Sequence, residues 1–513
     1  MTPATLNIFA SRLDAVCEEM GLVLRKAAFS PNIRDRLDYS CAVFDAAGAL
    51  CAQAAHIPVH LGSMAFAMQG IVAGVDWRPG DQLMLNDPYL GGTHLPDVTV
   101  IAPVFVDDGL CAFVVNRAHH ADIGAASPGS MPISSSLEQE GIVIEPVHLV
   151  RNDDIVAEAL QQVTTATRNR AESEGDFAAQ VAANRAGVAR LSSLIGRYGV
   201  NDFVDGVEAL NRYAERLARE ALADIPEGSY QFTDYLDDDG QDQRDIPIRV
   251  SLTVADRTVE ADFSGTASQV AGNVNCPLAV AAAAVYYVFR CLMPAQTPAC
   301  AGAFEPIRLH APEGCLLNAR KPAAVAAGNV ETSTRVVDVV LGALAQAVPD
   351  RVPAASHGSM NNLAMGSVDA DAPWDYYETI GGGMGAGPRG GGLSGLQTHM
   401  TNTLNTPLEV LESRFPVRVL GYGLRPGSGG EGSRRGGDGL VREFQFLTPA
   451  HYTLLTERRS HRPWGIAGGE DASPGLNLHN GQALPAKCEG ELAVGDRLRI
   501  ETAGGGGWGT KGS

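Results

Sequence analysis

Residues 86–131 read NDPYLGGTHLPDVTVIAPVFVDDGLCAFVVNRAHHADIGAASPGSM, and the interpretation of the whole chain starts from this stretch. Two runs of β-forming residues flank an Asp-Asp-Gly turn at 107–109, a pattern that predicts a hairpin. Paired strands lie about 5 Å apart, so the end of the second strand returns to the start of the first. The hairpin therefore brings His94 and Asp97 close to His119 or His120.

These side chains are of the types that bind divalent metal ions. Two imidazoles and a carboxylate can lie about 2.0–2.2 Å from a shared ion and leave positions open, as catalytic sites do. Such a set accepts zinc, manganese or iron. The alternative is that His94, Asp97 and His119 are ordinary exposed residues at strand ends. The glycine pair at 91–92, which allows close backbone approach, and the flexible run GAASPGS at 124–130 favour a metal site.

Length and composition bound the fold class. A chain of 513 residues is too long for one compact core, and its patterns predict an α+β, multidomain protein. We expect an N-terminal α+β region with the metal site (1–154), a helical segment (155–225), an α+β middle domain (226–365) and a glycine-rich, β-dominated C-terminal domain (366–513).

The charge balance and the cysteines indicate the environment of the protein. The formal net charge is −20, which argues against nucleic acid and against an anionic membrane as partners. The nine cysteines form no C-x-x-C pair, which is typical of a reducing compartment. The N-terminus lacks the apolar core of a signal peptide, and the longest apolar run, 277–289, is too short to span a bilayer. We therefore expect a cytoplasmic protein.

Three further polar candidates precede the hairpin. Apolar spacing predicts an opening helix over 4–28, and alternation predicts two strands around a turn at 46–48. Asp38 stands just before the first of these strands, and His56 and His60 follow the second. A histidine in such a place is more often a packed, hydrogen-bonded residue than a catalytic one. Both histidines are nevertheless candidates for proton transfer, because imidazole titrates near neutral pH.

The middle of the chain predicts scaffold elements. After the helical segment, alternation predicts strands over 229–265 around three consecutive aspartates, 237–239, which we expect to form a solvated loop rather than a cation site. Buried helices are predicted at 277–293 and 332–347. The sequence GNVETS at 328–333 is typical of an N-terminal cap for the second of them.

The last third is dense in glycine. Strand-like segments VREFQFL, LEVLESRFPVRVLGYGL and DRLRIET predict a β-rich domain with long glycine loops, such as GGGMGAGPRGGGLSG at 381–395 and GGGGWG at 504–509. No G-x-x-x-x-G-K-[ST] motif occurs in the sequence. If the chemistry uses ATP, this chain offers no recognisable phosphate loop of that kind.

Several long motifs, in order from about residue 30 to residue 509, carry a resemblance to a known family. They are SPNIRDRLDYSCAVFDAAGALCAQAAHIPVHLGSM, LNDPYLGGTHLPDVTV, NRAHHADIGAASPGSMP, GNVETSTRVVDVVLGAL and AGGGGWG. The chain resembles the hydantoinase B/5-oxoprolinase family, which includes subunits of N-methylhydantoinases, oxoprolinases and lactamases, and α-type subunits of acetone carboxylase. The resemblance implies that His94, Asp97 and His119 are metal ligands and that Asp38 contributes. It leaves His120 or Asp122 to orient the ligands.

The same resemblance implies a division of labour between two subunits. A larger hydantoinase A-type partner would bind ATP and Mg²⁺ and phosphorylate the carbonyl oxygen of a cyclic amide. The subunit resembled here would then open the activated ring of a hydantoin, a 5-oxoproline or a related lactam, with an ion that activates water or polarises the substrate oxygen. We therefore expect a hydrolase of C–N bonds in a hetero-oligomer. The chain lacks the ATP-binding half that is fused to other members, so activity of the isolated chain is not expected.

Two other functions stay open at this point. One is a subunit of an ATP-dependent ketone carboxylase, in which an activated enolate meets CO₂ or bicarbonate and a further small subunit is present. The other is a non-catalytic scaffold that positions its partner and uses its ion structurally. The sequence does not name the substrate.

Overall fold

The computed structural model describes residues 1–513 except 55, 56, 61, 370 and 513, so the predicted candidate His56 lies outside the described residues. The helices are α1 (Pro3–Ala27), α2 (Pro31–Arg34), α3 (Ser63–Ile71), α4 (Ala157–Thr164), α5 (Arg170–Tyr198), α6 (Val200–Leu222), α7 (Leu278–Leu292), α8 (Ser333–Leu344) and α9 (Leu408–Arg414). The strands of the first half are β1 (Tyr39–Asp45), β2 (Leu50–Ala54), β3 (Gln82–Leu85), β4 (Asp97–Val106), β5 (Gly109–His119), β6 (Val147–Arg151), β7 (Asp154–Ile155), β8 (Gly228–Asp238), β9 (Arg244–Ala255) and β10 (Thr258–Asp262). Those of the second half are β11 (Ile307–His310), β12 (Asn362–Ser367), β13 (Asp375–Glu378), β14 (Val417–Arg425), β15 (Gly439–Phe446), β16 (Ala450–Leu455), β17 (Leu476–His479), β18 (Gln482–Leu484), β19 (Lys487–Leu492) and β20 (Arg497–Glu501).

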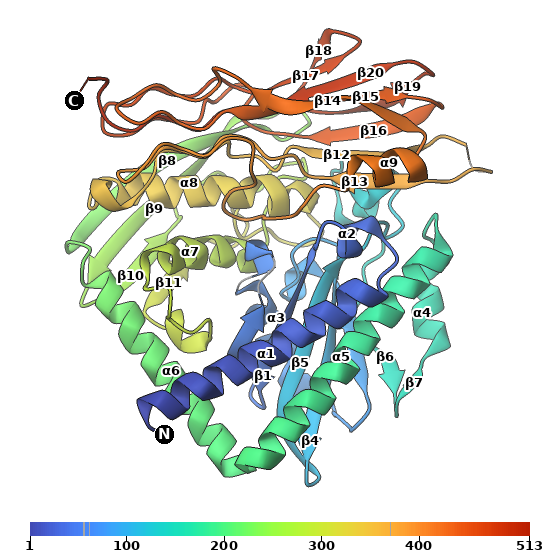
Figure 1. Ribbon diagram of the computed structural model, residues 1–513, viewed down its shortest axis with the longest axis vertical. Helices are drawn as coiled ribbons and strands as arrows, with labels where there is room; N and C mark the ends of the chain where they lie inside the picture. The colour runs from blue at the N-terminus through green and yellow to red at the C-terminus, as the bar shows by residue number, and fades with distance from the viewer. Residues whose placement is uncertain (55–56, 61, 370, 513) are drawn as a thin grey trace.

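The architecture is α+β, with strands gathered into several sheets (Figure 1). A seven-stranded sheet has the order β2-β1-β5-β4-β3-β6-β7, and a four-stranded sheet has the order β11-β10-β9-β8. Two further sheets, β13-β12-β16-β19 and β14-β15-β20-β17-β18, contain the strands of the last third. Figure 1 shows these last two sheets stacked at one end of the molecule, above α8 and the upper end of the seven-stranded sheet.

The predicted hairpin is present, and it forms the centre of the seven-stranded sheet. β4 and β5 pair in antiparallel register from Asp97 opposite His119 to Val106 opposite Gly109. The turn between them places Asp107 and Asp108 at φ values of 49° and 63°. Two successive residues with positive φ give the turn whose twist matches that of paired strands, and aspartate tolerates this backbone region better than most residues.

Helix α5 lies across the β4–β5 hairpin and is attached to it by side-chain amides (Figure 1). Gln180 donates to the carbonyl oxygen of Val98 at 2.9 Å, and Asn184 donates to that of Val100 at 3.0 Å. Asn116 on β5 in turn donates to the side-chain oxygen of Asn184 at 2.8 Å. Because buried polar groups need partners, these bonds fix the position of the helix on the sheet as well as stabilising it.

The segment predicted to cap α8 is itself helical, so that prediction is wrong. Gly328–Thr332 form a π-helical turn that continues directly into α8, and Thr332 makes no capping bond to it. Glu331 is fully buried, whereas a residue of a helix cap at the surface would be solvated. Close packing explains Gly328, since a Cβ at this position would lie 1.8 Å from the carbonyl oxygen of Asn275.

Two other local predictions are corrected. The three aspartates at 237–239 do not form a solvated loop, because Asp237 and Asp239 are buried. The carboxylate of Asp237 accepts hydrogen bonds from the backbone amides of residues 459–461, which ties β8 to the C-terminal part of the chain. The LEVLESR half of the segment predicted as a strand forms α9 instead. This helix ends just before Phe415-Pro416, where proline disfavours helical geometry in the preceding residue.

The glycine-dense runs of the last third lie side by side and are joined by backbone hydrogen bonds. Gly437 donates to Met384 and Gly505 donates to Gly437, each at 2.9 Å. A Cβ on Gly505 would lie 2.1 Å from the carbonyl oxygen of Met384. The segments therefore approach one another more closely than any residue with a side chain allows, which accounts for the glycine content.

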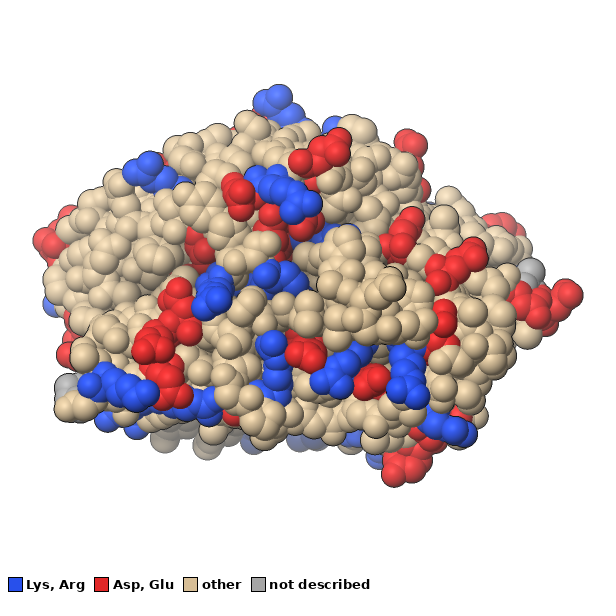
Figure 2. Space-filling view, turned by 90° about the horizontal axis from the view of Figure 1, so that it is seen from above, with Lys and Arg blue, Asp and Glu red and all other residues tan. Residues whose placement is uncertain are grey.

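The face that carries the C-terminal sheets bears both signs of charge. Figure 2 shows Lys and Arg groups interspersed with Asp and Glu groups across it. Ion pairs among these strands include Arg499 with Glu443 and Arg425 with Glu501. In the described part of the chain, no helix has both the length and the apolar character needed to cross a membrane.

Candidate metal centre

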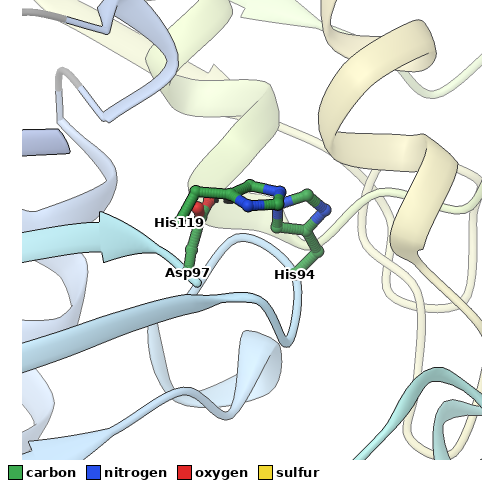
Figure 3. A group of neighbouring side chains, drawn as sticks. All are labelled: His94, Asp97 and His119. Atoms are coloured by element: carbon green, nitrogen blue, oxygen red, sulfur yellow. Dashed lines mark ion pairs between the residues drawn. The ribbon is translucent and has the colours of Figure 1, made fainter. Parts of the chain in front are cut away.

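The open end of the β4–β5 hairpin brings three of the predicted residues together. Asp97 begins β4, His119 ends β5, and the two are paired directly across the strands. His94 lies in the turn before β4, where its carbonyl oxygen accepts from the amide of Asp97 at 3.1 Å. Figure 3 shows the three side chains pointing toward one another. Each offers a potential ligand atom, and these atoms lie within 4.8 Å of one another.

The ligand atoms of this cluster are buried and unsatisfied. Among the described residues, no hydrogen-bond partner exists for His94 Nε2, Asp97 Oδ1 or His119 Nε2. The three residues are at most 3% exposed. A buried polar atom without a partner costs about 1–3 kcal/mol, so three in one place are unusual for a purely structural cluster. Three lone-pair donors of these types converging on one point fit a divalent cation.

The other ring nitrogens of the two histidines also contact buried groups. Nδ1 of His94 lies 3.3 Å from the carbonyl oxygen of Ala326. A carbonyl oxygen only accepts, so Nδ1 of His94 carries a proton, and in the neutral ring Nε2 presents the lone pair through which a histidine binds a metal. Nδ1 of His119 lies 3.0 Å from the carbonyl oxygen of His120 and 3.1 Å from the side-chain nitrogen of Asn32, so it has both an acceptor and a donor beside it.

The second carboxylate oxygen of Asp97 is surrounded by donors. Thr93 donates its hydroxyl to Oδ2, and Asn329 donates its amide to the same oxygen at 3.4 Å. Nε2 of His94 lies 3.3 Å from Oδ2, and Nε2 of His60 lies 3.5 Å from it. Oδ2 is thus anchored while Oδ1 stays free.

The electrostatics of the cluster keep Asp97 charged and His119 neutral. Burial acts to raise the pKa of Asp97, but His94 and His60 outweigh it and hold that pKa well below its usual range. Burial lowers the pKa of His119 well below that of a free imidazole. Burial acts to lower the pKa of His94 as well, but the charge of Asp97 raises it overall. An anionic carboxylate beside a neutral imidazole is what a metal ion requires of its ligands.

Asp38 and His60 stand beside the trio and form a second group with Asp97. The carbonyl oxygen of Asp38 accepts from the amide of His119 at 3.0 Å. Its carboxylate lies 3.8 Å from the guanidinium of Arg36, and burial raises its pKa. Nδ1 of His60 lies 2.9 Å from the hydroxyl of Ser40. The structure therefore places both predicted residues at the candidate centre.

The structure does not place His120 and Asp122 at the ligand atoms. His120 points to the opposite face of the strand, as alternation along a strand requires, and its Nε2 lies 3.0 Å from the side-chain oxygen of Gln180. Asp122 accepts hydrogen bonds from the hydroxyl of Ser130 at 2.9 Å and from the amide of Arg168 at 2.7 Å. It thus holds the loop that follows β5.

Sequence reasoning missed residues that reach the centre from distant parts of the chain. Asn329 belongs to GNVETS, a motif whose polar residues predict a helix cap. Tyr377 stacks on the imidazole of His119, with ring centroids 4.9 Å apart and planes 4° from parallel. Arg36 contacts the same tyrosine ring and donates to its carbonyl oxygen at 2.8 Å. Nothing in the sequence around Tyr377 signals this role.

Comparisons with known proteins place the chain in one family. The family model described as Hydantoinase B/oxoprolinase matches residues 2–511. A 5-oxoprolinase of Dictyostelium discoideum is 38% identical over 528 residues, covering 100% of this chain and 41% of that protein. This chain thus spans about two fifths of the length of that relative.

Two solved structures share the fold. An ATP-dependent caprolactamase from Pseudomonas jessenii superposes with a TM-score of 0.93 at 27% identity, over 99% of this chain and 91% of that chain. Acetone carboxylase in a nucleotide-free state superposes with a TM-score of 0.88 at 18% identity, over 99% of this chain and 76% of that chain.

Proposed function

Because the chain belongs to the hydantoinase B/oxoprolinase family, we propose that it is the metal-dependent subunit of an ATP-dependent enzyme that opens a cyclic amide. A hydantoinase A-type partner subunit binds ATP and phosphorylates the carbonyl oxygen of the ring, and this chain hydrolyses the activated intermediate. The substrate is a hydantoin, a 5-oxoproline or a related lactam. Relatives named as a 5-oxoprolinase and as an ATP-dependent caprolactamase support this class of reaction.

One observation carries the proposal. Ligand atoms of His94, Asp97 and His119 lie within 4.8 Å of one another, and the buried atoms His94 Nε2, Asp97 Oδ1 and His119 Nε2 have no hydrogen-bond partner within the described chain. A divalent ion such as Zn²⁺, Mn²⁺ or Fe²⁺, held by these residues, would supply a Lewis acid that lowers the pKa of water or polarises the substrate oxygen. Asp38, next to them, is a further candidate ligand.

The remaining residues of the centre have roles in handling protons and water. One water adds to the phosphorylated carbon, the ring C–N bond breaks with its electron pair on nitrogen, and a second water releases phosphate to leave a carboxylate. The departing nitrogen must take up a proton as the C–N bond breaks. His60, with one ring nitrogen near Asp97 and the other on the hydroxyl of Ser40, is the proposed carrier of that proton. The burial of the centre keeps bulk water away from the activated intermediate.

The first test is binding of divalent ions by the purified chain. We expect stoichiometric binding of zinc, manganese or iron, measured by elemental analysis and titration calorimetry. Asp97→Asn and His119→Ala should weaken binding by more than the roughly 10–100-fold that loss of an orienting group costs. The exposed His310 on β11 offers a control, since His310→Ala removes an imidazole that belongs to neither candidate ligand group. Retention of wild-type affinity in both ligand variants would overturn the proposed site.

The second test is activity with the partner that co-purifies from the source cell. ATP-dependent opening of hydantoin, 5-oxoproline or caprolactam should yield ADP and the ring-opened acid, and should be lost on Asp97→Asn with the fold retained. Loss of folding stability together with activity would point to a structural ion. Consumption of a ketone and bicarbonate instead of a cyclic amide would replace hydrolysis by carboxylation.

A further inference from the structure

One short segment contacts two of the candidate ligands directly and the third through two intervening side chains. We propose that residues 326–331, which include most of the π-helical turn, orient His94, Asp97 and His119 from outside the hairpin, and that Asn329 and Glu331 are its positioning residues. This inference rests on the proposed metal function of the centre. The segment lies more than 200 residues after the hairpin in the sequence, so no local pattern links the two.

The first contact is made by the backbone and reaches His94. The carbonyl oxygen of Ala326 lies 3.3 Å from Nδ1 of His94 and sets its tautomer. Ala326 is itself fixed, because its amide donates to the carboxylate of Glu140 at 2.9 Å. The amide of Val325 donates to the same carboxylate, also at 2.9 Å. The position of this carbonyl oxygen is therefore determined by a buried acid on a third segment.

The second contact is made by Asn329 and reaches Asp97. The amide of Asn329 donates to Oδ2 of Asp97 at 3.4 Å. Since a carboxylate oxygen only accepts, the NH₂ group must face Asp97, which fixes the orientation of the amide. The oxygen of Asn329 is buried and has no hydrogen-bond partner in the described part of the structure. The bond holds Oδ2, the carboxylate oxygen that lies 3.3 Å from Nε2 of His94, and so fixes the orientation of the carboxylate beside the ligand cluster.

The third contact runs from Glu331 to His119 through two side chains. Oε1 of Glu331 accepts from the side-chain amide of Asn362 at 2.7 Å. The side-chain oxygen of Asn362 accepts from the hydroxyl of Tyr377 at 2.7 Å. The ring of Tyr377 then stacks on the imidazole of His119, which determines the plane of that ring. All four residues are buried, so water does not compete for these bonds.

The π-helical geometry explains how one turn serves two ligands. Asn329 and Glu331 are two residues apart, and side chains with this spacing leave a helical turn in widely different directions. One therefore faces Asp97 while the other faces Asn362. Widened turns of this kind are frequent at functional sites. The motif GNVETS is thus assigned to the site rather than to a helix cap.

The experiment measures divalent-ion affinity of the purified chain, without partner or substrate. Asn329→Ala should weaken the binding of Zn²⁺ about 10–100-fold, because the carboxylate of Asp97 loses its anchor. Asn318→Ala is the control: Asn318 is partly buried, and its side-chain amide donates to the carbonyl oxygen of Ala311 at 2.9 Å and to none of the ligands. It should leave ion affinity unchanged even if it lowers thermal stability of the metal-free chain.

A conservative pair tests the connection to His119. Glu331→Gln keeps an oxygen that can accept from Asn362 and should retain affinity, whereas Glu331→Ala should weaken it about tenfold or more. Tyr377→Leu should do the same, and Tyr377→Phe, which keeps the stacked ring, should lose less. The visible spectrum of the Co²⁺-loaded protein at saturation should shift in the weakened variants, which a purely structural role would not cause.

The outcomes separate the inference from the function on which it rests. Wild-type protein that binds no divalent ion would overturn both. Binding by the wild type, with unchanged affinity and Co²⁺ spectrum in Asn329→Ala and Tyr377→Leu, would overturn the positioning role alone. If Asn329→Ala does not fold, the two Glu331 variants and the two Tyr377 variants decide the question.

Discussion

At the scale of single residues, Glu331 makes the stability of the protein depend on pH. Burial, reinforced by the nearby charge of Glu457, raises the pKa of Glu331 from 4.5 to about 8. A carboxyl whose pKa is raised by folding stabilises the native state fully below pH 4.5 and loses that contribution as pH rises through about 8.

Replacing this carboxyl by an amide should remove the pH dependence. We expect the free energy of unfolding of Glu331→Gln, relative to the wild type, to increase by on the order of 2–5 kcal/mol between pH 5 and pH 9. Denaturant titrations at several pH values measure it. The exposed Glu138 is the control, since Glu138→Gln removes no buried charge. If the free energies of unfolding of the wild type and the variant change in parallel between these pH values, the raised pKa of Glu331 would be contradicted.

The residues of the centre divide into those that sequence could suggest and those it could not. His94, Asp97 and His119 come together because one hairpin joins them, and hairpin geometry follows from alternation and a turn signal. Asn329 and Tyr377 reach the same place only through packing of segments far apart in the chain. Contacts of this kind produce no periodic pattern in the sequence. Strand alternation puts the side chains of His119 and His120 on opposite faces of β5, so only one of them can join the centre, and the family resemblance selected His119.

At the scale of elements, the attachment of α5 to the hairpin makes a testable prediction. Asn184→Ala would leave the carbonyl oxygen of Val100 and the amide of Asn116 each with one bond fewer in a buried interface. We expect a loss of roughly 2–4 kcal/mol in the free energy of unfolding, measured by denaturant titration. Ser193→Ala, on the exposed side of the same helix, should change it by less than about 0.5 kcal/mol. Equal effects of the two substitutions would show that the amides do not hold the helix.

The elements that sequence predicted well are those with a regular apolar period. The opening helix and the hairpin appear where spacing places them, and the segment 155–225, predicted as helical, contains α4, α5 and α6. The errors fall where a polar residue is buried by something remote. Asp237 binds backbone amides of the C-terminal part, and Glu331 binds Asn362. In both cases the polar character of the residue predicted exposure to solvent. Contacts with distant parts of the chain bury it instead and provide its hydrogen-bond partners.

At the scale of the whole molecule, a buried ionic junction connects the middle of the chain to its C-terminal part. The guanidinium of Arg458 lies 2.8 Å from Asp234 on β8 and 2.5 Å from Asp338 on α8. Glu457, the residue before Arg458, pairs with Lys487 on β19 at 2.5 Å. Each of these five side chains is less than a tenth exposed.

Breaking this junction should destabilise the whole protein. Asp338→Asn leaves Arg458 with one anionic partner in a buried setting, and we expect a loss of about 3–5 kcal/mol, read as a lower thermal midpoint. The pair of Asp224 with Arg351 is the surface counterpart, with Asp224 68% exposed. Asp224→Asn should cost at most about 1 kcal/mol. A small effect of Asp338→Asn would mean that the junction does not hold these parts of the chain together.

The distance along the chain between the hairpin and its orienting segment has a consequence for synthesis. His119 leaves the ribosome about 200 residues before Ala326, an interval of roughly 10–40 s at usual rates of translation. During that interval the nascent polypeptide carries imidazoles and a carboxylate without the carbonyl, amide and stacked ring that order them. Under the proposed function, ordered capture of an ion is therefore expected to be one of the last events of maturation, after most of the polypeptide has been made.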